Sequence, residues 1–246
     1  MRHLSQCLES VRWADEVLVF HAGGEEPKTG PTVLPSLKIR NVATSGEARK
    51  LAAEIKTDWI LYLWGEERVE AELQDELRAL CRDASAQSLR AYRIPIRSYL
   101  LGRWVEGSLS GPSPSARLFR GVEELSMDGW EGSRLKGKPA AAPARGWIGD
   151  YGSSELSHAV DHLQSLSDFR TENLRAMASP PSPLRTVLCS VGVFMQMIFL
   201  NRLFSRGLAG LTLSALAAYG VLLSGAKVWE MRNVRRGESG NDKIAK

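Results

Sequence analysis

The sequence predicts an α/β fold, with a mostly parallel sheet flanked by helices and a hydrophobic helical hairpin at the C-terminal end. Two observations predict the body. Apolar, β-branched runs alternate with amphipathic segments up to residue 178, and helical connections between strands favour a parallel sheet. A third observation predicts the hairpin, because two uncharged stretches, residues 186–200 and 208–226, follow one another near the end.

The first third of the body alternates between helix and strand patterns. Apolar residues recur at helical spacing in three segments, which are residues 4–11, 45–57 and 70–81. Three other segments have the β-branched and aromatic composition of strands, and these are residues 16–20, 37–42 and 58–63.

The remainder of the body has shorter elements. We expect strands over residues 91–97 and 115–120, separated by a loop rich in Gly, Ser and Pro. Residues 136–145 have the Ala, Lys and Pro composition of an irregular surface segment, and residues 154–177 have the pattern of a long helix.

A proline-rich segment divides the chain. Residues 179–183 read Ser-Pro-Pro-Ser-Pro, which is typical of a stiff linker. The sequence therefore predicts four regions, namely a body over residues 1–178, the linker 179–183, a membrane-associated helical hairpin over 184–233 and a polar tail over 234–246.

The hairpin is the most apolar part of the sequence. Its second stretch, at 1.5 Å per residue, is about 28 Å long and approaches the ~30 Å hydrocarbon thickness, whereas the first stretch falls short. A stripe of small residues on the second stretch would permit close helix contact, and it comprises Gly210, Ser214, Ala217, Val221 and Ser224. The alternative is a buried helical hairpin in a soluble protein.

Charge is distributed unevenly. Residues 183–246 hold nine Lys and Arg against three acidic residues, whereas the body is close to neutral. Positive charge beside apolar sequence favours an anionic membrane surface as a partner, and nucleic acid is not expected. The three cysteines are far apart and lack metal-ligand spacing, which is typical of a reducing cytosolic setting. We therefore expect the protein to be located at the cytoplasmic face of the inner membrane.

Five segments in order resemble one enzyme family. They are residues 7–20 (CLESVRWADEVLVF), 57–69 (TDWILYLWGEERV), 91–104 (AYRIPIRSYLLGRW), 116–120 (ARLFR) and 207–230 (GLAGL to AKVWE). Together they are similar to bacterial family 2 glycosyltransferases of the lipopolysaccharide-core type. The resemblance implies a GT-A-like fold that binds a nucleotide-sugar donor and transfers the sugar to a cell-envelope glycan or lipid-linked acceptor.

The resemblance also implies a divalent cation, Mn²⁺ or Mg²⁺, held by carboxylates against the donor diphosphate. The family pattern Leu-Asp-Ala-Asp-Glu-Arg stands here as Leu63 to Arg68. Glu66 takes the place of the second Asp and is the candidate metal ligand, while Trp64 replaces the first Asp at the donor site. In the alternative interpretation, Glu66 and Glu67 begin the next helix, where acidic residues favour the positive end of the helix dipole.

Other donor-site positions are altered. Gly23 and Gly24 stand in the family's nucleotide-binding loop, and a plain strand-to-helix turn is an equally good role for them. Arg117 matches the family motif and has the geometry to contact phosphate, although an arginine beside a strand can instead pair with a carboxylate. The family's apolar first strand has no counterpart before Leu4 in this sequence.

On the acceptor side, Glu131 occupies the place of the family's glutamate, which the resemblance implies to be the general base. The alternative role of Glu131 is that of an exposed loop residue. Asp150 stands where the family has a histidine. His158 and His162, four residues apart, are expected on a solvated helix face, with a zinc site as the alternative. Because so many family positions are altered, the second functional reading is a catalytically inactive partner or regulator in envelope assembly.

Overall fold

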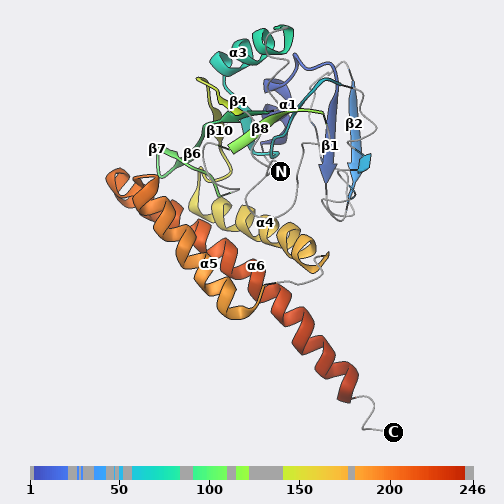
Figure 1. Ribbon diagram of the computed structural model, residues 1–246, viewed down its shortest axis with the longest axis vertical. Helices are drawn as coiled ribbons and strands as arrows, with labels where there is room; N and C mark the ends of the chain where they lie inside the picture. The colour runs from blue at the N-terminus through green and yellow to red at the C-terminus, as the bar shows by residue number, and fades with distance from the viewer. Residues whose placement is uncertain are drawn as a thin grey trace.

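A computed structural model of the chain (Figure 1) is an α/β body resting on a long helical hairpin. The structure describes part of the chain, and the statements below refer to that part. The described residues are 3–21, 27, 29, 36–42, 47, 50, 51, 57–83, 91–109, 115–121, 141–176 and 181–241.

The described strands form three sheets. The first is the parallel pair β1 (Val17–His21) and β2 (Leu37–Asn41). The second has the order β4 (Glu67–Val69), β10 (Ile148–Asp150), β6 (Ile96–Leu100), β7 (Arg103–Glu106). The third has the order β3 (Trp59–Leu61), β8 (Ser115–Arg120), β5 (Ala91–Ile94), β9 (Ala141–Pro143).

The second and third sheets are mixed, so the predicted mostly parallel sheet is not confirmed. β8 runs antiparallel to both β3 and β5, and β7 runs antiparallel to β6. The β6–β7 connection consists of Leu101 and Gly102, both with positive φ (50° and 74°). A two-residue turn can join only antiparallel strands. Parallel strands need a long crossover connection, so β6 and β7 cannot be a parallel pair. Residues 141–143 were expected to be irregular, but they form β9, parallel to β5.

The helices of the body follow the predicted apolar spacing. The first is α1 (Leu4–Ser10), with Leu4, Cys7 and Leu8 buried. Helix α3 (Ala71–Arg82) buries Leu73 and Leu77 completely, as its single apolar face predicted. Helix α4 (Leu156–Ala176) lies beneath the sheets, between them and the hairpin (Figure 1). The expected helix over residues 45–57 lies mostly outside the described residues.

The hairpin begins at α5 (Pro183–Met195), where the Ser182 hydroxyl accepts a hydrogen bond from the Arg185 amide and Pro183 occupies the first turn. A π-helical turn (Gln196–Leu200) and a 3₁₀ turn (Leu203–Arg206) connect it to α6 (Gly207–Asn241). Residues 183–200 and 203–233 are both long and apolar enough to cross a membrane. Helix α6 continues to Asn241, inside the region expected to be a polar tail.

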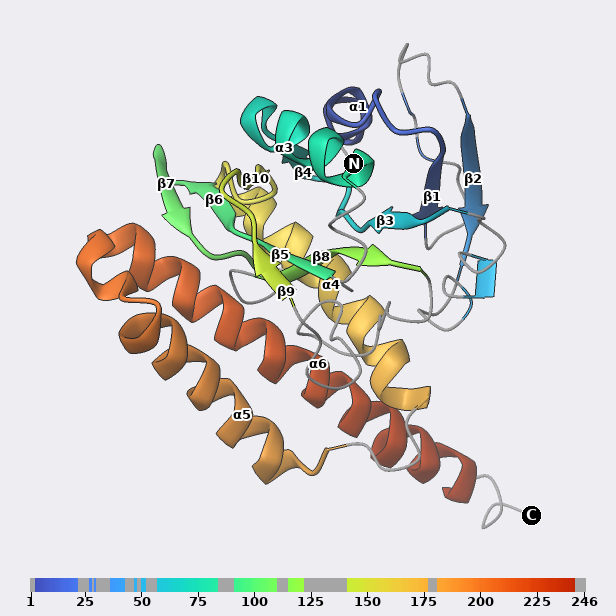
Figure 2. The ribbon, with the colours of Figure 1, turned by 45° about the horizontal axis from the view of Figure 1, so that its top comes forward.

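Body and hairpin share one hydrophobic core. A single cluster of buried side chains draws members from β6, β7, α4, α5 and α6, and Figure 2 shows α6 passing directly beneath the body. The members from the body are Leu100, Val105, Leu109, Ala159, Leu163 and Leu166, and those from the hairpin are Val193, Met197, Leu203, Ala209, Leu213, Ala217 and Val221. The five residues of the predicted small-residue stripe on α6, the first Gly210 and the last Ser224, are all buried.

Candidate functional site

Three predicted site residues meet in one region. Trp64 and Glu66 lie in the connection between β3 and β4, and Arg117 reaches the same place from β8. The other predicted residues, Gly23, Gly24 and Glu131, lie outside the described residues. The region around Glu66 is therefore the candidate site that the structure can describe.

This region contains a buried ion pair between Arg117 and Glu67. The Arg117 Nη2 donates to Glu67 Oε1 at 2.7 Å, and both side chains are only 1% exposed. Glu67 Oε2 also accepts a hydrogen bond from the Trp64 amide at 2.9 Å. Arg117 has thus taken the carboxylate partner that the sequence allowed as an alternative to phosphate. Because Glu67 binds the Trp64 amide, the pair fixes the turn that carries Glu66.

Glu66 is paired with a histidine from α4. The Glu66 Oε2 and His162 Nδ1 are 2.6 Å apart, and Glu66 keeps 23% of its side chain exposed. Burial raises the pKa of the Glu66 carboxyl, but the hydrogen bond and charge of His162 outweigh burial and hold that pKa below its ordinary value. Burial lowers the pKa of His162, but Glu66, Asp150 and Glu67 together raise it above its ordinary value. The pairing therefore favours the charged form of both groups.

Asp150 lies beside this pair at the end of β10. Its Oδ2 accepts hydrogen bonds from the hydroxyls of Ser98 (2.8 Å) and Ser108 (2.7 Å), and its Oδ1 accepts one from the Gly152 amide (3.0 Å). Asp150 is 1% exposed, so these three donors replace the water it would otherwise bind. Asp150 is thus a buried, hydrogen-bonded carboxylate beside the Glu66–His162 pair.

Gly152 lets the three side chains approach one another. A Cβ at this position would lie 3.2 Å from Glu66 Cβ, 3.3 Å from Asp150 Oδ1 and 3.3 Å from His162 Cδ2. The Tyr151 amide next to it donates to the Glu66 carbonyl at 3.1 Å. The close approach holds Glu66, Asp150 and His162 in one cluster, although 96 residues separate the first from the last.

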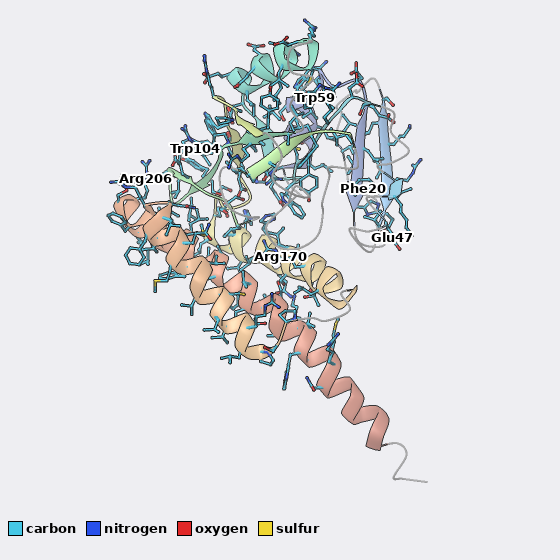
Figure 3. All side chains as sticks on the ribbon, in the orientation of Figure 1. Phe20, Glu47, Trp59, Trp104, Arg170 and Arg206 are labelled. Atoms are coloured by element: carbon cyan, nitrogen blue, oxygen red, sulfur yellow. The ribbon has the colours of Figure 1, made fainter. Side chains whose placement is uncertain are left out.

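Aromatic and cationic groups pack around Tyr62 and Trp64, in the connection between β3 and β4. The Tyr62 and Trp64 rings make an edge contact at 5.6 Å, and the Arg117 guanidinium lies 5.4 Å from the Tyr62 ring centroid. Arg170 comes from α4 (Figure 3) and donates to the Leu109 carbonyl at 3.0 Å. Burial lowers the pKa of Arg170 to about 10. Trp64 also packs against the cluster shared by body and hairpin, so the site borders the hairpin.

A divalent cation would find an incomplete protein ligand set here. Among the described residues no group of three His, Cys, Asp or Glu side chains is arranged to hold a metal ion. Mg²⁺ and Mn²⁺ bound with a nucleotide usually take only one or two carboxylates, and substrate phosphates and water complete the shell. Glu66 pairs with His162 but keeps part of its side chain exposed, which fits that limited role, whereas Glu67 and Asp150 are fully buried with their internal partners.

Two residues of the candidate site, His162 and Glu67, were misplaced by the sequence-based predictions. His162 was expected on a solvated face but is buried. Its spacing contains a usable signal, because it stands three residues after Ala159 and four before Leu166, both buried on the same helix. Glu67 does not begin a helix, since it opens β4 and α3 starts four residues later. No sequence signal identifies Glu67 as the partner of Arg117.

The comparisons with known proteins assign no family. No protein-family model matches the sequence, and no curated protein matches it.

Proposed function

We propose that the chain is a membrane-associated glycosyltransferase of the family 2 type, with a GT-A-like body. It transfers a sugar from a nucleotide-sugar donor to a cell-envelope glycan or lipid-linked acceptor at the cytoplasmic face of the inner membrane. The observation that carries the proposal is Glu66, a partly exposed carboxylate in the turn after β3. The resemblance places the family's metal-binding carboxylate at the same position.

The charge state of Glu66 supports this role. Its pKa is below the ordinary value, so the carboxylate is anionic at neutral pH, as a ligand of Mn²⁺ or Mg²⁺ must be. The cation, when bound, would neutralise charge on the departing nucleoside diphosphate. In the proposal, Trp64, Gly23 and Gly24 contribute to the donor site, while Arg117 acts through Glu67 and positions the turn.

The arrangement of strands is compatible with the GT-A part of the proposal. β1 and β2 form a parallel pair, and β3 lies at the end of a separate sheet. The acceptor side of the proposal rests on Glu131 as general base.

The second candidate function is a catalytically inactive partner or regulator in envelope assembly. A specific observation favours it, because the carboxylates of Glu66, Glu67 and Asp150 all have internal partners. A site whose charges are satisfied within the protein needs no cation or diphosphate to be stable. The two functions differ in one measurable property, which is sugar transfer.

A transfer assay with matched variants tests the proposal. Full-length protein in detergent is incubated with Mn²⁺, labelled uridine and guanosine diphosphate sugars and a lipid extract. We expect label in the lipid fraction, and a loss of about 100-fold or more in Glu66→Gln, because the cation ligand is weakened. Glu72→Gln on α3, exposed in the same half of the body, should keep the wild-type rate.

Two outcomes of this assay would change the account. Equal rates for Glu66→Gln and wild type would remove Glu66 from the donor site. An unchanged rate in Glu131→Gln would remove only the assignment of the general base.

A further inference from the structure

The hairpin presents two opposite faces, and the first of them, mainly on α6, is packed against the body. At the tip, Leu203 and Leu213 pack in one cluster with Val105 of β7. At the far end, the Lys227 ammonium contacts the Asp168 carboxylate at 2.5 Å and the Ser167 hydroxyl at 2.7 Å. The body therefore follows α6 from the hairpin tip to its C-terminal half, as Figures 1 and 2 show.

This length excludes a simple crossing of the membrane by the intact fold. Along α6, from Leu213, which packs beside Gly107 after β7, to Lys227, which pairs with α4, the rise of 1.5 Å per residue amounts to about 21 Å, so the body covers most of the length that would have to cross the ~30 Å hydrocarbon. If the hairpin crossed a bilayer, β7 and α4 would be drawn into the hydrocarbon. Helix α4 exposes Asp161, Gln164 and Asp168, and buried membrane positions are costly for such side chains.

The opposite face of the hairpin is exposed and apolar. On α6 the exposed apolar side chains recur every three or four residues and so lie on one face. They are Leu208, Leu211, Ala215, Tyr219, Leu222, Ala226 and Trp229. Helix α5 and the turn after it expose a matching series, which comprises Leu184, Val187, Leu188, Val191, Met195, Phe199 and Leu200. We call these two series the outer face. A continuous exposed apolar surface of this kind marks an interaction site.

Basic residues stand at both ends of the outer face. Arg185 stands at the start of α5, Arg202 and Arg206 stand at the tip, and Arg232 follows the exposed Trp229 near the other end. Within residues 183–233 the sequence has a single acidic residue, Glu230. Apolar side chains with basic residues at both ends match an anionic bilayer surface, in which the charges meet headgroups and the apolar groups meet acyl chains.

We propose that the hairpin lies parallel to the membrane plane in a single leaflet of an anionic bilayer. The outer face is buried about 5–10 Å deep, at the boundary of headgroups and acyl chains, and the body rests on the aqueous side. Both ends of the hairpin, including the tip, stay on the same side as the body. This inference rests on the membrane attachment in the proposed function, but not on sugar transfer.

Vesicle flotation tests whether the outer face binds lipid. The full-length protein is mixed with phosphatidylcholine vesicles, with and without phosphatidylglycerol. We expect flotation that is stronger with phosphatidylglycerol, and a partition coefficient at least about tenfold lower in Leu188→Glu/Phe199→Glu, because each substitution removes a buried apolar contact. The matched control is Val160→Glu on α4. Val160 is 47% exposed, as much as Val187 on the outer face, and its variant should float like the wild type.

A charge variant tests the anionic preference. Arg185→Gln/Arg206→Gln removes two basic residues, each worth ~1 kcal/mol at an anionic surface, so flotation with phosphatidylglycerol should fall about tenfold or more. Flotation without phosphatidylglycerol should change little. Equal loss on both kinds of vesicle would overturn the assignment to anionic lipid.

Thiol labelling distinguishes lying in the leaflet from crossing it. Ser205, exposed at the tip, is changed in the variant Ser205→Cys, and Cys81, exposed on α3, reports on the body. A membrane-impermeant maleimide added outside the vesicles should label positions 205 and 81 alike, whereas the exposed Cys189 of α5 should become protected on binding. Labelling of position 205 only after the vesicles are permeabilised would overturn the proposal.

The alternative partner for the outer face is a second copy of the chain. The flotation samples also test for such a dimer. Stable dimers that persist without lipid, together with no flotation on either kind of vesicle, would overturn the proposal. Sugar transfer in detergent is measured separately on Leu188→Glu/Phe199→Glu. Retained transfer with lost flotation would show that the two proposals stand or fall independently.

Discussion

Removal of residues 183–246 is expected to leave a body that no longer folds as a soluble monomer. The linker suggested a division at Pro183, and a separable body would be released from membranes when the hairpin is deleted. The structure leads to a different expectation, because the deletion uncovers Leu100, Val105, Leu109 and Leu163, all at most 1% exposed. Burying each such side chain stabilises the fold by about 1.5–3 kcal/mol. Their combined loss is similar to the whole stability of a typical domain, about 5–15 kcal/mol.

The measurement is size-exclusion chromatography combined with thermal unfolding followed by circular dichroism. Residues 1–182 should elute as aggregates and lack a cooperative transition, whereas a control that lacks only residues 242–246 should behave like the full chain in detergent. A monomeric 1–182 fragment with a sharp transition would show that the hairpin is dispensable for the body. It would also weaken the argument that the hairpin cannot leave the body to cross the membrane.

The second large effect is expected at Arg117. In Arg117→Met the carboxylate of Glu67 stays buried without its counter-charge, which typically costs about 3–5 kcal/mol of unfolding free energy. Arg93→Met is the control, since Arg93 lies on the adjacent strand β5 but points to solvent, and such substitutions usually change stability by less than about 0.5 kcal/mol. Urea unfolding of the full chain in detergent gives both values.

The double variant Glu67→Met/Arg117→Met provides a second check on the same ion pair. It removes both charges together, so stability should recover most of the way towards wild type. If Arg117→Met alone is within ~1 kcal/mol of wild type, the pair does not hold the turn that carries Glu66.

The local elements were largely predictable from the sequence. α1, α3, α4 and the hairpin followed from apolar spacing, since a helix buries one face whatever it packs against. The strands β1, β2, β3, β5 and β8 and the start of β6 followed from composition. The mixed pairing was not predicted, because strand composition does not specify which neighbour a strand takes or in which direction.

The candidate site was predictable only in part. The position of Glu66 after β3 followed from its place in the sequence pattern. Its partner His162 did not, because the contact joins residues 96 positions apart and depends on how α4 docks against the sheets. For Arg117, residue chemistry left two partners open, phosphate or a carboxylate, and only the tertiary structure identified Glu67.

The most direct test of the central claim is a calorimetric titration of nucleotide-sugars into the full-length protein in detergent, with Mn²⁺ present. The account predicts heat of binding for a uridine or guanosine diphosphate sugar that disappears when Mn²⁺ is replaced by a chelator, because the cation links Glu66 to the diphosphate. No heat with any of these donors, from protein that is folded by circular dichroism, would contradict the glycosyltransferase proposal and leave the inactive partner in its place.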